Sequence, residues 1–136
     1  MRIHLWLPGN AIIKESLIFK ATKNTADGIA RVLLSGQLDS AAAHDFEKQL
    51  DDVLKSGETR ILVDFTELNF ISSAGLRVFL SYAKKVLKVH GRITLAGMSA
   101  PVFNVFESVG FSSIFPIYPV ISDAVADLAK HGNQSK

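Results

Sequence analysis

The stretch ILVDFTELNFISSAGLRVFL, residues 61–80, decides the fold of this chain. Its first part belongs to RILVDF (60–65), an almost wholly apolar run of the kind found in a strand that is covered on both faces. The part that begins at Ser72 has its apolar residues at helical spacing, and this pattern continues to Gly91. The stretch therefore predicts a central strand followed closely by an amphipathic helix.

The segments before this stretch predict a hairpin and a helix. Residues 16–22 and 28–36 are rich in β-branched and apolar residues, and the turn-forming segment KNTADG separates them. The period then changes to that of a helix, which Asp39 or Ser40 can cap and Gly57 can end. The apolar face of this helix is formed by Ala43, Phe46, Leu50, Val53 and Leu54.

The segments after it continue the alternation of strands and helices. We expect a strand at 92–97, a helix at 100–110, a short extended segment at 113–118 and a closing helix at 122–132. Pro116 places the short segment at an edge of the sheet, because proline cannot donate a hydrogen bond to a ladder. The order predicts an α/β sandwich, with a mixed sheet of about five strands and about four helices mainly on one face.

Composition excludes several classes of function. The chain has 136 residues, 48% of them hydrophobic and 21% charged, which is typical of one soluble globular domain. It has no cysteine, as a reducing compartment permits, so we expect it in the cytoplasm. Its 15 Lys and Arg and 13 Asp and Glu are scattered, which gives no sign of direct nucleic-acid binding. Apolar runs are too short for membrane insertion, and a signal peptide is not expected at residues 1–15.

The sequence also lacks the common patterns of catalysis and ligand binding. A nucleophile elbow around Ser73 would need glycine two residues before it, where Ile71 stands, although Gly75 lies two residues after. No phosphate-binding glycine loop occurs, and the histidines lack the spacing of a metal site or a triad. These are His4, His44, His90 and His131. We therefore expect no catalytic residue, no metal and no cofactor.

Two adjacent serines, Ser72 and Ser73, lie where the strand connection becomes a helix. Either hydroxyl could cap the helix by accepting a hydrogen bond from a free backbone N–H of the first turn. A phosphate there would add a charge of about −1.5 to −2 near a helix N-terminus, which favours anions. Gly75 costs about 1 kcal/mol relative to alanine inside a helix, which suggests a close approach or a contact surface. Both interpretations, a structural cap and a phosphorylation switch, stay open on these residues.

Four pieces of the sequence resemble the STAS domain family, and within it the stand-alone bacterial anti-sigma factor antagonists. The resemblance covers nearly everything from Leu17 to Leu128, and we expect an N-terminal arm at 1–15, a STAS domain at 16–131 and a tail at 132–136. The pieces are LSGQLDSAAA (34–43), ILVDFTELNFISSAGLRVFL (61–80), GRITLAGMSAPVFNVFESVGFSSIFPIY (91–118) and SDAVADL (122–128).

The resemblance implies a protein of signal transduction and transcription regulation that acts by partner switching. Such an antagonist binds an anti-sigma factor that is also a serine kinase, and the sigma factor is then released. Phosphorylation of the antagonist breaks the complex, and a PPM-type serine phosphatase restores it. The protein would be a substrate without catalysis of its own, and a homodimer is compatible with the sequence.

The family's site residues carry over onto this sequence with one departure. When Gly75 is set on the family glycine of Asp-Ser-Ser-Gly, Ser72 stands at the aspartate, Ser73 at the first serine and Ala74 at the second. We take Ser73, ahead of Ser72, as the candidate phosphoacceptor. Asp39 matches the family's aspartate before the first helix, and Asp64 is expected to support the serine loop. The predicted partner interface consists of Asp39, Ser40, Ser72, Ser73, Ala74, Gly75 and Arg77.

Two rival functions remain at this point. Ala74 stands where the family pattern has its second serine, so the usual hydroxyl is missing there. This favours a STAS subunit that is never phosphorylated, in a larger signalling complex or a lipid-transport assembly. A serine hydrolase, from another class, would need histidine and aspartate near Ser73, and no motif supplies them.

Overall fold

The computed structural model describes residues 18–24 and 27–134, so the expected arm at 1–15 lies outside the described residues. None of the helices in this described part is long and apolar enough to cross a membrane. The elements, in chain order, are β1 (Ile18–Asn24), β2 (Ile29–Leu38), α1 (Ser40–Lys55), β3 (Arg60–Ile71), α2 (Ser73–Lys88), β4 (Arg92–Ala96), α3 (Ala100–Ser108), the 3₁₀ turn η1 (Phe111–Ser113), β5 (Ile117–Tyr118) and α4 (Ile121–Gln134).

The strands form one mixed sheet in the order β1-β2-β3-β4-β5. β1 and β2 are antiparallel neighbours, as a hairpin requires, and every later pair is parallel. Parallel neighbours need a crossover, and α1, α2 and α3 supply the three crossovers. In the part of the chain that the structure describes, the mixed sheet of five strands and the four α-helices confirm the predicted fold class.

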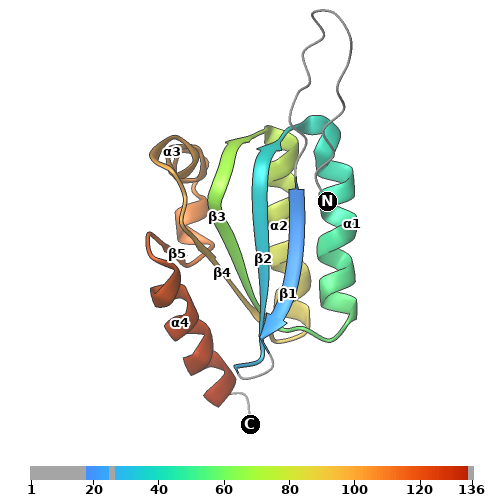
Figure 1. Ribbon diagram of the computed structural model, residues 1–136, viewed down its shortest axis with the longest axis vertical. Helices are drawn as coiled ribbons and strands as arrows, with labels where there is room; N and C mark the ends of the chain where they lie inside the picture. The colour runs from blue at the N-terminus through green and yellow to red at the C-terminus, as the bar shows by residue number, and fades with distance from the viewer. Residues whose placement is uncertain (1–17, 25–26, 135–136) are drawn as a thin grey trace, which may run out of the picture.

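The two faces of the sheet are covered differently (Figure 1). On one face, α1, α2 and α3 enclose a core centred on the ring of Phe79, whose centroid lies 5.2 Å from that of Phe46 on α1 and 5.5 Å from that of Phe65 on β3. On the other face, α4 packs Ala124 and Leu128 against the sheet in a separate small cluster. The helices therefore lie mainly on one face, as predicted, and the larger core lies beneath α1, α2 and α3.

Strand β3 is longer than the sequence predicted. It runs to Ile71 rather than ending at residue 65, and Asp64 therefore lies inside the strand. The Asp64 carboxylate accepts hydrogen bonds from the backbone N–H (2.8 Å) and the hydroxyl (2.5 Å) of Thr66, so these bonds support β3 itself and not the serine loop. The extension pairs with β2 through two register shifts, which break the alternating pattern that would have revealed a strand.

The predicted extended segment at 113–118 is reduced to the two residues of β5 at the sheet edge. The 3₁₀ turn η1 ends at Ser113, the first residue of the predicted segment, and residues 114–116 are irregular. The carbonyl of Pro116 accepts a hydrogen bond from the backbone N–H of Leu95 (3.0 Å), a role that does not require a proline N–H. The edge position that Pro116 predicted is thus confirmed, over a shorter strand.

The carboxylate of Asp127 links α4 to β4 and β5. It accepts hydrogen bonds from Nε and Nη2 of Arg92, the latter at 2.9 Å, and from the hydroxyl of Tyr118 at 2.5 Å. Its side chain is only 11% exposed. The bonds from the Arg92 guanidinium hold the pKa of Asp127 below its usual value and raise the pKa of Arg92. The hydrogen bond from the Tyr118 hydroxyl to Asp127 raises the pKa of Tyr118. This cluster holds α4 on its face of the sheet.

We expect Asp127→Asn to lower the free energy of unfolding by about 1–3 kcal/mol at pH 7, because it removes charge-assisted hydrogen bonds from a largely buried group. The folded-state pKa of Asp127 is depressed, so the ionised carboxylate stabilises the fold above its unfolded pKa near 3.9. This stabilisation is lost as pH falls through the folded pKa. Urea unfolding at pH 7 and at about pH 3 measures both effects.

The matched control is Asp52→Asn on the exposed side of α1. It removes the same charge without touching the Arg92 cluster, and we expect a change within about 0.5 kcal/mol at either pH. Equal effects of the two substitutions at pH 7 would contradict the role assigned to Asp127.

Candidate functional site

The candidate site lies where α1 and α2 begin, side by side at one end of the sheet (Figure 1). Strands β2 and β3 are parallel neighbours that end together, with Leu38 paired to Ile71. The backbone N–H of Ser72 donates a hydrogen bond to the carbonyl of Leu38 at 2.8 Å. Because each strand leads directly into a helix, this pairing brings the two helix N-termini next to each other.

Each helix begins with a side-chain cap. Oδ1 of Asp39 accepts a hydrogen bond from the backbone N–H of Ala42 (3.0 Å), and Oγ of Ser72 accepts one from the backbone N–H of Gly75 (3.1 Å). Neither helix has an acidic residue in its first turn. The partial positive charge of the α2 N-terminus is therefore not offset by its own cap or first turn, whereas the Asp39 carboxylate lies at the N-terminus of α1.

The two serines occupy different environments. Ser72 is half-buried, and its hydroxyl serves as the cap of α2. Ser73 is exposed as the first residue of α2, and its hydroxyl forms no hydrogen bond within residues 18–24 and 27–134. The capping interpretation thus accounts for Ser72 and leaves Ser73 without a structural role.

Gly75 lies beneath this surface rather than in it. An added Cβ would come within 2.8 Å of Cγ of Leu38 and 3.1 Å of Cγ1 of Ile71. Gly75 is buried with a helical backbone, so the close approach that the sequence indicated is an approach of α2 to the sheet. Its small size is explained by internal packing and requires no partner.

A groove of about 610 Å³ runs between α1 and α2 from this end of the molecule. It starts at Ser40 and Ala74, beside Ser73, and Arg77 lies one helical turn further along α2. Among the described residues, the lining consists of Ser40, Ala43, His44 and Glu47 from α1 and of Ala74, Arg77, Val78, Leu80, Ser81 and Lys84 from α2.

Of the predicted interface residues, Asp39, Ser40, Ser72, Ser73 and Ala74 thus gather at this end. The sequence analysis missed the rest of the groove. Residues i, i+3, i+4 and i+7 share a helix face, but only the packing of α1 against α2 shows which faces meet.

The surroundings of the serines lack the geometry of a hydrolase in the part of the chain that the structure describes. His44 lies in the groove, but no hydrogen bond joins it to Ser72 or Ser73. His131 instead contacts the carbonyl of His90 through Nε2 at 3.2 Å. Across the described ranges, no group of three or more His, Cys, Asp or Glu could hold a metal ion. The arrangement can present a hydroxyl to another protein, but it does not activate that hydroxyl.

Comparisons with known proteins agree with this architecture. A family model described as the STAS domain matches residues 20–124. A candidate anti-sigma factor antagonist of Bordetella bronchiseptica, BtrV, is 41% identical over 98 residues, which are 72% of this chain and 84% of that protein.

Two solved structures show the same fold. A candidate anti-sigma factor antagonist of Thermotoga maritima has a TM-score of 0.76 at 23% identity, over 81% of this chain and 93% of its own. The Bacillus cell fate determinant SpoIIAA, solved in its phosphorylated form, has a TM-score of 0.63 at 21% identity, over 82% of this chain and 99% of its own.

We expect Gly75→Ala to destabilise the protein by about 1–3 kcal/mol, because its Cβ would overlap the buried side chain of Leu38. Helix propensity alone would give the opposite sign, a gain of about 1 kcal/mol. Thermal or urea unfolding of the purified variant measures the change.

The double variant Leu38→Ala/Gly75→Ala is the internal control. Leu38→Ala opens space for the new methyl group of Gly75→Ala. The double variant should therefore be destabilised by less than the sum of the destabilisations of the two single variants. Additive effects, or a stabilising Gly75→Ala, would show that α2 does not need this close approach.

Proposed function

Because the chain belongs to the STAS domain family, we propose that it is an anti-sigma factor antagonist of the partner-switching kind. It binds an anti-sigma factor that is also a serine kinase, and phosphorylation of Ser73 ends the complex. A PPM-type serine phosphatase restores the binding form. The observation that carries this proposal is the exposed hydroxyl of Ser73 at the first position of α2, beside the start of α1.

The position of Ser73 suits a modification that changes binding and leaves the fold intact. A phosphate on an exposed side chain displaces nothing from the core, and the N-terminal end of α2 favours its negative charge. A partner packed against the same surface would have to bury that charge, which costs several kcal/mol unless cations match it. The likeness of the fold to SpoIIAA, a protein solved in a phosphorylated form, supports the proposal.

Ser73 is the better acceptor of the two serines. Ser72 is half-buried, and its Oγ is already engaged with the Gly75 N–H. A kinase would have to draw this side chain out of its cap to reach the hydroxyl. Phosphorylation of Ser73 leaves the cap in place.

The remaining parts of the proposal follow from the same role. The chain would be a substrate and binding partner rather than an enzyme, and it would act in the cytoplasm beside the transcription machinery. Residues 16–131 would form the STAS domain, with 1–15 and 132–136 as its arm and tail. The alternative is a STAS subunit of a larger assembly that is never phosphorylated, and it is favoured by Ala74 at the second position of the serine pattern.

Incubation with ATP and each purified anti-sigma factor kinase of the source genome, followed by mass spectrometry, tests the acceptor. We expect phosphate on Ser73 and none in Ser73→Ala. Ser72→Ala should still be phosphorylated, although loss of its cap should lower the free energy of unfolding by about 1 kcal/mol. Binding to one of these proteins without any phosphate transfer would select the alternative.

Affinity for the same anti-sigma factor tests the switch. We expect Ser73→Asp to weaken binding at least about tenfold, because it places a charge in the contact surface, whereas Ser73→Ala should bind like the unmodified protein. Isothermal titration calorimetry measures both. An unchanged affinity for Ser73→Asp and for the phosphorylated protein would remove the basis of the switch.

A further inference from the structure

We propose that the groove between α1 and α2 receives an acidic segment of the anti-sigma factor, and that phosphate on Ser73 excludes this segment by charge. The proposal rests on the proposed function and names the chemistry of the partner at that site. It is carried by the charges that line the groove and by the position of Ser73 at its end.

Arg77 and Lys84 give the α2 wall of the groove two unpaired positive charges. Both side chains are exposed, and neither forms an ion pair within residues 18–24 and 27–134. Two exposed cations on one wall attract carboxylates from a partner and repel basic segments.

Glu47 on α1 is the single carboxylate among the groove-lining residues in the described part of the chain. Its Oε2 lies 3.7 Å from Nζ of Lys85, which also binds Asp51 at 2.9 Å. Lys85 shares one positive charge between these two carboxylates, so it offsets the negative charge of Glu47 only in part. Among the described lining residues, Arg77 and Lys84 still outnumber Glu47, so the net charge that the groove offers to a partner is positive.

The cations follow Ser73 along one face of α2. Arg77 lies four residues after Ser73, and Lys84 lies seven residues after Arg77, so these positions share a stripe about 16 Å long. Between the charged residues the groove is lined by the half-buried side chain of Leu80, with the buried Val78 at its floor. A segment that alternates carboxylate and apolar side chains matches this order of charges and contacts.

A phosphate on Ser73 would act on this groove in two ways. It would lie one helical turn from Arg77, where i,i+4 neighbours of opposite charge pair, and it would draw the guanidinium away from the partner. Its remaining negative charge would repel the carboxylates of the entering segment. Both effects weaken binding without moving α1 or α2.

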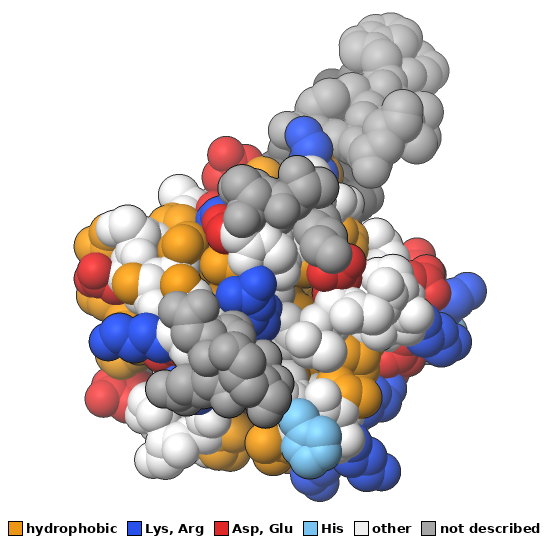
Figure 2. All heavy atoms as spheres, turned by 90° about the horizontal axis from the view of Figure 1, so that it is seen from below, with side chains coloured by type: hydrophobic (Ala, Val, Ile, Leu, Met, Phe, Trp, Pro, Cys, Tyr) orange, Lys and Arg blue, Asp and Glu red, His pale blue; other side chains and the backbone are white. Residues whose placement is uncertain are grey.

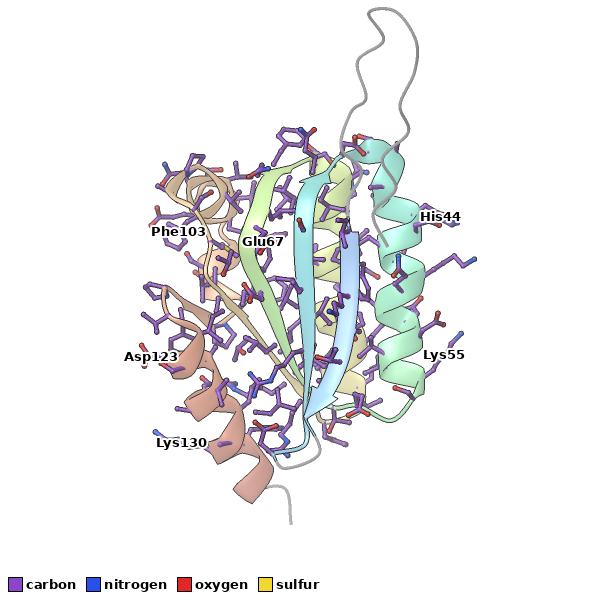
Figure 3. All side chains as sticks on the ribbon, viewed as in Figure 1. His44, Lys55, Glu67, Phe103, Asp123 and Lys130 are labelled. Carbon is purple, nitrogen blue, oxygen red and sulfur yellow. The ribbon has the colours of Figure 1, made fainter. Side chains whose placement is uncertain are left out.

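The far ends of the same two helices offer matched controls. Lys55 closes α1 and Lys88 closes α2, both exposed and outside the groove lining. Figure 3 shows His44 near the start of α1 and Lys55 near its end. On the opposite end of the molecule, seen in Figure 2, acidic and basic side chains are interspersed rather than separated.

Carbodiimide cross-linking tests the proposal directly, because the reagent joins a lysine amine to a carboxylate in contact with it. The full-length protein is mixed with the anti-sigma factor that binds it in the preceding experiment, and peptides are identified by mass spectrometry. We expect Lys84 joined to an aspartate or glutamate of the anti-sigma factor. Cross-links at Lys55 or Lys88 with equal or greater yield, and none at Lys84, would overturn the proposal.

Charge neutralisation gives an independent measurement. We expect Arg77→Gln and Lys84→Gln each to weaken binding about threefold to tenfold and to reduce its dependence on salt concentration. Lys55→Gln and Lys88→Gln should change the affinity less than twofold. Circular dichroism of each variant establishes that the fold is kept.

The outcomes separate this inference from the proposed function. If no anti-sigma factor binds the unmodified protein, the proposed function falls, and this inference falls with it. If an anti-sigma factor binds, and all four neutralised variants bind it as tightly as the unmodified protein does, the antagonist role stands and an acidic segment in the groove is excluded. Tighter binding by Arg77→Gln would indicate a basic segment and would also overturn the inference.

Discussion

The parallel pairing of β2 with β3, completed by the hydrogen bond from the Ser72 N–H to the Leu38 carbonyl, is the constraint on which the site depends. When two parallel strands end together, the helices that follow them begin at the same end of the sheet. Gly75 then allows α2 to start in contact with Leu38, where any side chain would force it outward. Asp39 and Ser73, far apart in the sequence, become neighbours of one surface for this reason.

The other side of α2 explains why this surface can change its charge while the fold stays the same. Phe79 is fully buried, and its ring packs against Phe46 and Phe65, so the inward face of α2 is fixed by aromatic contacts from α1 and β3. Ser73 and Arg77 face solvent on the same helix. Ser73 and Arg77 are therefore outside the core although they stand on the same helix, and a charge added at Ser73 does not act on the packing.

The order of strands and helices could be predicted from the sequence because each element has a clear period and a cap. The length of β3 could not, since exposed residues such as Thr66 and Phe70 interrupt its pattern and the strand is held there by backbone pairing to β2. The sequence indicated that one of the two serines caps α2. Which one does so depends on where β3 ends, and this was the part of the fold that the pattern left undefined.

Contacts between elements distant in the sequence were beyond prediction from the residues. The pairing of Arg92 with Asp127 depends on how α4 lies across β4, and the groove depends on the rotation of α1 against α2. The hydrophobic period of a single helix determines neither the orientation of α4 on the sheet nor the rotation of α1 against α2.

A switch of this kind has a defined energetic requirement. A modification shifts a binding equilibrium only by the difference in free energy that it makes between the free and bound states. A hundredfold loss of affinity needs about 2.7 kcal/mol, which is in the range of one or two ion pairs shielded from solvent in an interface. A phosphate that pairs with Arg77 and repels an entering carboxylate changes two such interactions at once. In the proposed switch the scaffold beneath Ser73 would therefore need no second conformation, because the charge added at the mouth of the groove would separate the two states.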